Sequence, residues 1–214
     1  MNYAEIKKYD IANGPGVRVS LFVSGCTIHC KGCFNPETWD PNFGKPFGDT
    51  EFKEIKDFLS KPYVQGLTIL GGEPLDYDHP DKLYPLVHMV QNMPDKNVWI
   101  FTGHDLEWVI GKIKNGNDSI TRLLYETDIL VEGPFKEELK DPSLKFRGSK
   151  NQTIVKIRQV IDTYIKTGTW KISFSYYQSK TKTAQEVLRE RLYLSRCHNP
   201  VRGLLGKVGS PEDE

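Results

Sequence analysis

The chain has 214 residues, a net charge of +1, 38% hydrophobic residues and 27% charged residues. This length suits one domain with a sizeable core, and this composition excludes a wholly disordered protein. The near-zero net charge gives no sign of a basic surface for nucleic acid. No apolar run is long enough to cross a bilayer, and the N-terminus lacks the apolar core of a signal peptide. We therefore expect a cytoplasmic protein without nucleic-acid or membrane partners.

The first predicted elements are a turn and a strand. Residues 13–16 read Asn-Gly-Pro-Gly, which is typical of a turn because glycine accepts positive φ and proline fixes its own φ. Hydrophobic residues then recur at every second position over residues 17–23, which predicts a β-strand. The strand leads directly into a loop that carries Cys26, Cys30 and Cys33 in a C-x3-C-x2-C array. Three thiols on one short loop indicate a metal site.

Three kinds of site compete for these thiols. A structural zinc site needs four ligands, and the remaining cysteine, Cys197, lies far along the chain. Disulfide bonding would leave one of the three clustered thiols unpaired. A 4Fe-4S cluster held by three thiolates leaves one iron open to chelate a small molecule, and we prefer this interpretation. His29 could supply a fourth ligand, but we expect it to be an exposed loop residue.

After the cysteine array, proline and glycine recur between residues 36 and 48, which predicts that the loop continues without helix or strand. A helix is predicted next, with Thr50 as its N-cap. Its apolar face is formed by residues at helical spacing, namely Phe52, Ile55, Phe58 and Leu59. A short apolar strand over residues 66–70 follows, and it ends in the segment GGEP, residues 71–74.

Helical and strand patterns alternate along the rest of the core. Helices are predicted over residues 81–91, 106–114 and 119–126, and strands over residues 97–101 and 128–131. This order implies parallel strands joined by right-handed crossovers, with the ligand site at their carboxyl ends. The cysteine loop, GGEP and the segment TGH (residues 102–104) each follow a strand directly. We therefore expect these three segments to meet along one edge of the sheet.

The cysteine array resembles the signature of the radical S-adenosylmethionine (SAM) superfamily. Two further segments are similar to those of the activases of glycyl-radical enzymes, namely NGPGVR at the start of the strand and CFNPETW from the third cysteine onward. ILVEGPF and DPSLKFRGSKNQ resemble the subfamily that activates anaerobic ribonucleoside-triphosphate reductase, and this resemblance covers residues 1–157. It implies an α/β fold of the radical SAM type, which is a partial, open β/α barrel with mainly parallel strands.

The resemblance also implies the cofactors and the residues that bind them. Cys26, Cys30 and Cys33 would hold a 4Fe-4S cluster, and S-adenosyl-L-methionine would bind its open iron. Residues near the cluster would contact SAM, namely Gly32, Phe34, Gly71, Gly72, Glu73 and Thr102. Glycines allow the backbone to approach the methionyl end of SAM closely, although GGEP could also be a plain strand-to-helix turn. We expect no catalytic residue beyond the cluster ligands.

Individual roles at this site are left open in several places. Glu73 either accepts a hydrogen bond from the ligand's ammonium or orders the turn, and the ring of Phe34 could serve simple packing. Thr102 could reach the ribose or adenine of SAM. His104 is expected to be a surface or structural histidine. Asp76 and Asp78 could form a cation site, but we expect both to be solvated loop carboxylates.

The expected reaction is reductive cleavage of SAM to a 5′-deoxyadenosyl radical, which abstracts hydrogen from a glycine of the reductase. The partners would be the anaerobic ribonucleoside-triphosphate reductase and an electron donor such as flavodoxin. One alternative is the activation of another glycyl-radical enzyme such as pyruvate formate-lyase. An alternative of another class is an iron-sulfur electron carrier or a zinc-stabilised binding module. The segment RGSKNQ, residues 147–152, is either a docking surface for the reductase or a loop with satisfied polar groups.

We predict two regions, an activase domain over residues 1–157 and a C-terminal extension of unknown role over residues 158–214. The extension contains the β-rich segment WKISFSYY and a helix that begins at Thr183 with Glu186 in a capping box. We expect Cys197 to be a free thiol and the final residues, GSPEDE, to be disordered.

Overall fold

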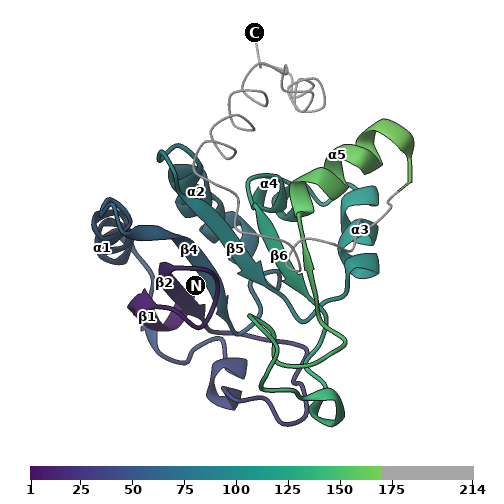
Figure 1. Cartoon of the computed structure of the whole chain (residues 1–214), viewed down its shortest axis with the longest axis horizontal. Helices are drawn as coiled ribbons and strands as arrows, with labels where there is room; N and C mark the ends of the chain where they lie inside the picture. Colours follow the sequence, from purple (N-terminus) through teal and green to yellow (C-terminus); the bar gives the residue numbers. More distant parts are fainter. Residues whose placement is uncertain (170–214) are drawn as a thin grey trace, which may run out of the picture. The chain divides into compact units, whose positions relative to one another are not determined.

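The computed structural model describes residues 1–169 of the chain. They form a seven-stranded sheet in the order β3-β1-β2-β4-β5-β6-β7 (Figure 1). The strands are β1 (Asn2–Asp10), β2 (Val17–Val23), β3 (Lys45–Pro46), β4 (Val64–Gly71), β5 (Asn97–Phe101), β6 (Ile129–Glu132) and β7 (Thr153–Val155). The four central strands β2, β4, β5 and β6 are parallel, whereas β1, β3 and β7 pair antiparallel at the two sides. The predicted α/β class and parallel centre are confirmed, in an open, mixed sheet.

Five helices cover the sheet: α1 (Asp49–Leu59), α2 (His79–Gln91), α3 (Leu106–Lys114), α4 (Asp118–Tyr125) and α5 (Ile157–Thr167). All five contribute to one apolar core together with alternate residues of the parallel strands, such as Val19 and Leu21 of β2. Because side chains alternate between the faces of a strand, this shared core places the helices on one face of the sheet. Within residues 1–169, none of the helices has the length and apolar character needed to span a bilayer.

Strand β1 is absent from the sequence prediction. Its burial alternates between exposed and intermediate along most of its length, as expected for a strand near the side of a sheet, and it pairs antiparallel with β2. The sequence also misses two short 3-10 helices, η1 (Pro36–Trp39) and η2 (Glu137–Leu139). These elements depend on pairing and loop packing, which the local hydrophobic pattern does not encode.

The predicted N-cap of the first helix is wrong by two residues. Helix α1 begins at Asp49, with Gly48 as its N-cap, so Thr50 lies inside the first turn. The side chain of Glu51 accepts a hydrogen bond of 2.9 Å from the backbone N–H of Gly48. This bond closes the helix start, so no capping hydroxyl is needed.

Helix α5 begins at Ile157, the predicted end of the activase domain, and Ile157, Val160 and Ile161 belong to the common core. The division of the chain at residue 157 stays a prediction. The segment WKISFSYY, the helix predicted from Thr183, the residue Cys197 and the final GSPEDE lie outside the described residues.

The NGPGVR segment forms a brace at the amino ends of the parallel strands. Arg18 is fully buried. Its guanidinium donates hydrogen bonds to the Thr68 hydroxyl (2.7 Å), the Leu67 carbonyl (2.7 Å) and the Asn97 side-chain oxygen (2.8 Å). A Cβ at Gly14 would lie 2.7 Å from Cδ of Arg18, so a side chain there would displace the arginine. The segment thus joins β2, β4 and β5.

Candidate functional site

The loops that follow β2, β4 and β5 meet at the carboxyl edge of the sheet, as the sequence predicts (Figure 1). The backbone N–H of Gly72 donates to the carbonyl of Val23, and that of Glu73 donates to the carbonyl of Gly25, both at 2.7 Å. The backbone N–H of Gly103 donates to a carboxylate oxygen of Glu73, also at 2.7 Å. The GGEP loop therefore lies between the cysteine loop and the TGH loop and is bonded to both.

The cysteine loop leaves β2 and is supported by the 3-10 helix η1. The backbone N–H groups of Gly25 and Cys26 donate to the carbonyls of Thr38 (2.7 Å) and Trp39 (3.2 Å). His29 is exposed, as expected, and has a positive φ of 50°. Its ring stacks on Trp39 with centroids 4.6 Å apart. This stacking gives His29 a packing role in the loop.

Cys26, Cys30 and Cys33 are partly exposed free thiols. Burial raises the pKa of the Cys26 and Cys30 thiols, and the negative charge of Glu73 adds to the increase. The Cys26 and Cys30 thiols are therefore protonated at neutral pH, and binding of a metal centre must release these protons.

The donor set fits an iron-sulfur cluster chemically, because soft thiolates on one loop are the ligands that such clusters take. Within residues 1–169, three or more His, Cys, Asp and Glu side chains are nowhere gathered closely enough to hold a single metal ion. In a cubane each thiolate binds a different iron, so the three sulfur atoms need not converge on one ion.

The two glycines of GGEP permit close contact of the end of β4 with β2 and with the cysteine loop that follows β2. Gly71 has a φ of +108°, and a Cβ there would lie 2.8 Å from backbone atoms of Phe22 and Val23. A Cβ at Gly72 would lie 2.4 Å from the carbonyl oxygen of Gly25. A side chain at either position would push the cysteine loop away from the sheet.

Glu73 is buried, with 1% of its surface exposed. Its carboxylate accepts hydrogen bonds from the backbone N–H of Leu75 (3.0 Å), the Thr102 hydroxyl (2.7 Å) and the backbone N–H of Gly103. Burial raises the pKa of Glu73 to about 7, against the lowering effect of His104 and of these hydrogen bonds. These hydrogen bonds order the turn that contains Glu73, which is one of the two roles expected for it. The Thr102 hydroxyl donates to Glu73 in the same network.

Asp76 and His104 interact with each other, and Asp76 also bonds the cysteine loop. Asp76 is buried, so the expectation of a solvated loop carboxylate is wrong. One oxygen of Asp76 accepts from both the backbone N–H and the hydroxyl of Thr27, each at 2.7 Å. The other oxygen lies 2.9 Å from Nε2 of His104. Burial tends to raise the pKa of Asp76, but the bonds from His104 and Thr27 outweigh it and lower the pKa overall. The one sequence signal available was that all three residues follow strand ends.

Gly32 and Phe34, the other residues expected to contact SAM, lie at the exposed rim of the cysteine loop. Gly32 has a φ of +72°, and a Cβ there would lie 3.0 Å from the carboxyl carbon of Glu137. Glu137 also lies 3.6 Å from the Lys31 ammonium. Phe34 is 81% exposed. The rim thus offers an exposed aromatic residue directly after Cys33 in the chain.

The RGSKNQ segment uses its polar groups to hold the loop that follows β6. The side-chain oxygen of Gln152 accepts from the backbone N–H groups of Gly148 (2.8 Å) and Ser149 (3.1 Å), and its amide donates to the carbonyl of Gly133 (3.0 Å). The Asn151 amide donates to the carbonyl of Pro134 (2.7 Å). These contacts match a loop with largely satisfied polar groups, and docking of a partner on it stays a prediction.

Known proteins resemble most of this chain. Residues 12–155 match the family model described as "4Fe-4S single cluster domain". The chain is 37% identical over 164 residues to the "Anaerobic ribonucleoside-triphosphate reductase-activating protein" of Escherichia coli (strain K12), covering 74% of this chain and 100% of that protein.

Proteins of the same name in other organisms give similar values. The relative from Vibrio cholerae is 39% identical over 162 residues, which cover 72% of this chain and 97% of that protein. The relative from Enterobacteria phage T4 is 38% identical over 155 residues, which cover 72% of this chain and 93% of that protein. The similarity therefore spans nearly the full length of these relatives.

Proposed function

This chain belongs to the family of anaerobic ribonucleoside-triphosphate reductase-activating proteins, and from this premise we propose that it activates such a reductase by reductive cleavage of SAM at a 4Fe-4S cluster. The observation that carries the proposal is the position of three free thiols on one loop, at the sheet edge where the GGEP and TGH loops also end.

In this proposal Cys26, Cys30 and Cys33 would hold the cluster through their thiolates. When bound, the cluster supplies one electron to the sulfonium of SAM, whose cleavage gives methionine and a 5′-deoxyadenosyl radical that takes a hydrogen atom from a glycine of the reductase. The protein orients the ligand and keeps water and competing hydrogen donors away from it. None of these tasks requires a general base, in keeping with the roles of Glu73 and His104 in hydrogen bonds within the protein.

We assign SAM to the surface between the cysteine loop and the GGEP loop. Gly71, Gly72 and Glu73 would line its methionyl end. The backbone N–H groups of Gly72 and Glu73 already donate to Val23 and Gly25, so the contact would fall to the carbonyls of the two glycines. Gly32 and Phe34 would flank the adenine, for which the exposed ring of Phe34 is available. Thr102 would contribute through its backbone carbonyl, since its hydroxyl already donates to Glu73 and its N–H to the carbonyl of Val131.

A radical SAM fold of the partial-barrel type is part of the proposal. It is supported by the parallel order β2-β4-β5-β6 and by the position of the cysteine loop directly after the first of these strands. The proposal also includes a cytoplasmic location and a small electron donor such as flavodoxin. The names of the relatives favour the reductase as client over pyruvate formate-lyase or another glycyl-radical enzyme.

The proposal is tested with the full chain, reconstituted anaerobically with iron and sulfide. After reduction and addition of SAM and the reductase, we expect 5′-deoxyadenosine and the EPR signal of a glycyl radical. Added SAM should also change the EPR spectrum of the reduced cluster, because an open iron responds to a ligand and a fully ligated cluster does not. Absence of both the nucleoside and the radical would reject the proposal.

The choice of client needs a parallel reaction in which pyruvate formate-lyase replaces the reductase. We expect the radical on the reductase alone. A radical that forms on the lyase and not on the reductase would move the function to the alternative client.

A further inference from the structure

Asp76 joins the GGEP loop to the cysteine loop at a point between two of the thiols. Its two bonds to Thr27 fix the backbone N–H and the side chain of the residue that directly follows Cys26. The peptide that connects Cys26 to Thr27 is therefore held by a carboxylate on a neighbouring loop. Both bonds measure 2.7 Å, within the range for hydrogen bonds that a carboxylate accepts.

The carboxylate is itself held in place from the opposite side. Its second oxygen pairs with His104, whose ring stacks on Trp108 with centroids 3.6 Å apart and an angle of 2° between the planes. The side chains of Asp76 and His104 are 7% and 14% exposed. Since both oxygens are engaged and the pair is shielded from water, the Asp76 side chain has one favoured orientation.

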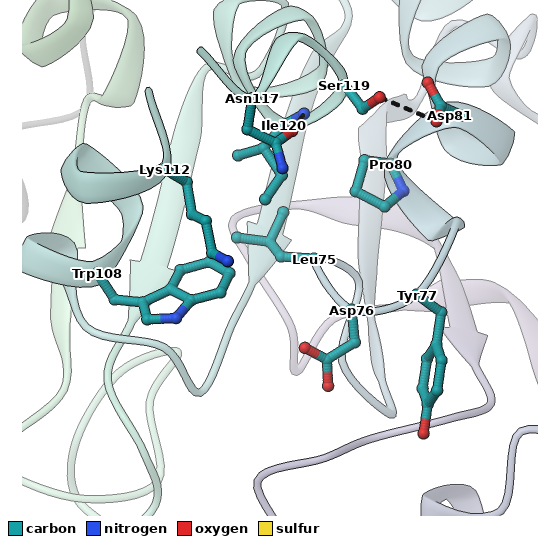
Figure 2. Close-up of a pocket in the computed structure, with 10 residues that line it drawn as sticks. All are labelled: Leu75, Asp76, Tyr77, Pro80, Asp81, Trp108, Lys112, Asn117, Ser119 and Ile120. Atoms are coloured by element: carbon teal, nitrogen blue, oxygen red, sulfur yellow. Dashed lines mark hydrogen bonds between the residues drawn. The ribbon is translucent and has the colours of Figure 1, made fainter. Parts of the chain in front are cut away.

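Asp76 and Trp108 line a cavity of about 260 Å³, together with residues from the first turns of helices α2 and α4. Figure 2 shows these side chains around the cavity. The same cavity contains a second aspartate, Asp81, which accepts hydrogen bonds from the Ser119 hydroxyl and the Arg122 guanidinium, both at 2.9 Å. Both of these partners lie on α4 and not on the cysteine loop. Asp81, whose side chain is 50% exposed, is thus a control for Asp76 that has a hydroxyl partner and a basic partner but no bond to Thr27.

We propose that Asp76 is a positioning residue for the metal centre, which holds Thr27 and with it the segment from Cys26 to Cys30 in the conformation that binds the cluster. This inference rests on the proposed cluster at Cys26, Cys30 and Cys33. A loop that is already ordered loses less conformational entropy when it binds its ligand, so the bonds from Asp76 strengthen cluster binding. Residues that orient the ligands of a metal site in this way typically change metal affinity roughly 10- to 100-fold when they are replaced.

The experiment measures how fast the reconstituted full chain loses its cluster to an excess of an iron chelator under anaerobic conditions. The variants are Asp76→Ala, Thr27→Val, the double variant and the control Asp81→Ala. Thr27→Val keeps the shape of the side chain and removes one hydroxyl, so the side chain at this position can no longer donate to Asp76. The EPR spectrum of the reduced cluster is recorded for each variant, because it reports the geometry of the ligands directly.

For Asp76→Ala we expect cluster loss to become roughly 10- to 100-fold faster, together with a changed EPR spectrum. The effect of Thr27→Val should be smaller, since its backbone N–H still bonds Asp76. The double variant should lose its cluster no faster than Asp76→Ala, because the hydroxyl has no role once the carboxylate is gone. The control Asp81→Ala should match the wild type.

Three results would overturn the inference: unchanged cluster loss in both single variants, additive effects in the double variant, or an equal effect of Asp81→Ala. If Asp76→Ala fails to fold by circular dichroism of the apo chain, Thr27→Val decides, because it removes a single hydrogen bond at an exposed residue. A wild-type chain that takes up no cluster would reject the proposed function itself, whereas a stable cluster that ignores these substitutions would reject the positioning role alone.

Discussion

The two ends of the same parallel strands carry buried polar groups that serve different purposes. At the amino ends, Arg18 donates to acceptors on β4 and β5 and closes a network within the sheet. At the carboxyl ends, Glu73 and Asp76 are bonded just as fully, yet the loops they hold present three free thiols and the exposed ring of Phe34. A characteristic sequence segment can therefore mark a structural brace or a site, and the geometry of its partners tells the two apart.

Removal of a cluster thiol should give the largest effect and should separate function from stability. We expect Cys26→Ala, Cys30→Ala or Cys33→Ala to abolish cluster retention and activation, because no other thiolate on the loop can replace the lost ligand. The apo chain should lose less than about 1 kcal/mol of unfolding free energy, since the thiols are only partly buried. Iron content measures cluster retention, and chemical denaturation of the apo chain measures the unfolding free energy. The control Cys197→Ala, at a position outside the described residues, should keep its cluster, and cluster loss there would show a fourth thiolate ligand.

Replacement of the buried arginine should show the opposite pattern. We expect Arg18→Met to lower the unfolding free energy by about 3 to 5 kcal/mol, because acceptors on Thr68, Leu67 and Asn97 are left buried without their donor. The partly exposed Arg122 provides the control, and Arg122→Met should cost less than about 1 kcal/mol. Denaturation of the apo chains gives both values. Equal losses of unfolding free energy in the two variants would show that the buried network of Arg18 stabilises the fold no more than the exposed ion pair of Arg122 does.

The buried carboxyl at the site should make stability depend on pH. The pKa of Glu73 is raised from 4.5 to about 7 in the folded chain, so the folded state holds a proton that the unfolded state has lost between these pH values. Its contribution to stability is therefore complete below about pH 4.5 and is lost as the pH rises through about 7, by up to about 3 kcal/mol.

The matched variant for this prediction is Glu73→Gln, which cannot ionise. Between pH 5 and 8 the wild-type apo chain should lose more unfolding free energy than this variant, as measured by chemical denaturation at each pH. Identical pH profiles for the two chains would contradict the raised pKa.

Two glycine substitutions should give the smallest effects, with opposite signs. In Gly72→Ala the new Cβ meets the carbonyl oxygen of Gly25, so we expect a loss of about 1 to 3 kcal/mol and a cluster that dissociates faster. Gly111 lies inside helix α3 with open space around a Cβ, so Gly111→Ala should add about 0.5 to 1 kcal/mol and leave the cluster unaffected. Thermal denaturation and iron content test both. A neutral Gly72→Ala would show that the cysteine loop does not depend on this close contact.

Much of the fold was predictable because helices α1 to α4 and the central strands each have their own hydrophobic period. Helix α5 and the short strands β3 and β7 were not predicted. The pattern over residues 17–23 and 97–101 matches β2 and β5 in the structure, and that over residues 106–114 matches α3. Strand β1 was missed because it is paired through β2 and lies near the side of the sheet, so its own sequence carries a weak pattern. The cap of α1 was missed because the carboxylate of Glu51 closes the helix start in place of a hydroxyl.

The sequence by itself determined that three thiols lie on one loop after a strand and that the GGEP and TGH segments lie at the same edge of the sheet. The order of strands and helices along the chain and the spacing of residues suffice for this. The tertiary structure alone decided which polar groups meet. Arg18 bonds Asn97, 79 residues away, and Asp76 bonds Thr27 and His104, 49 and 28 residues away. Such pairs depend on the distance and angle at which separate loops are brought together, and a one-dimensional pattern does not carry that information.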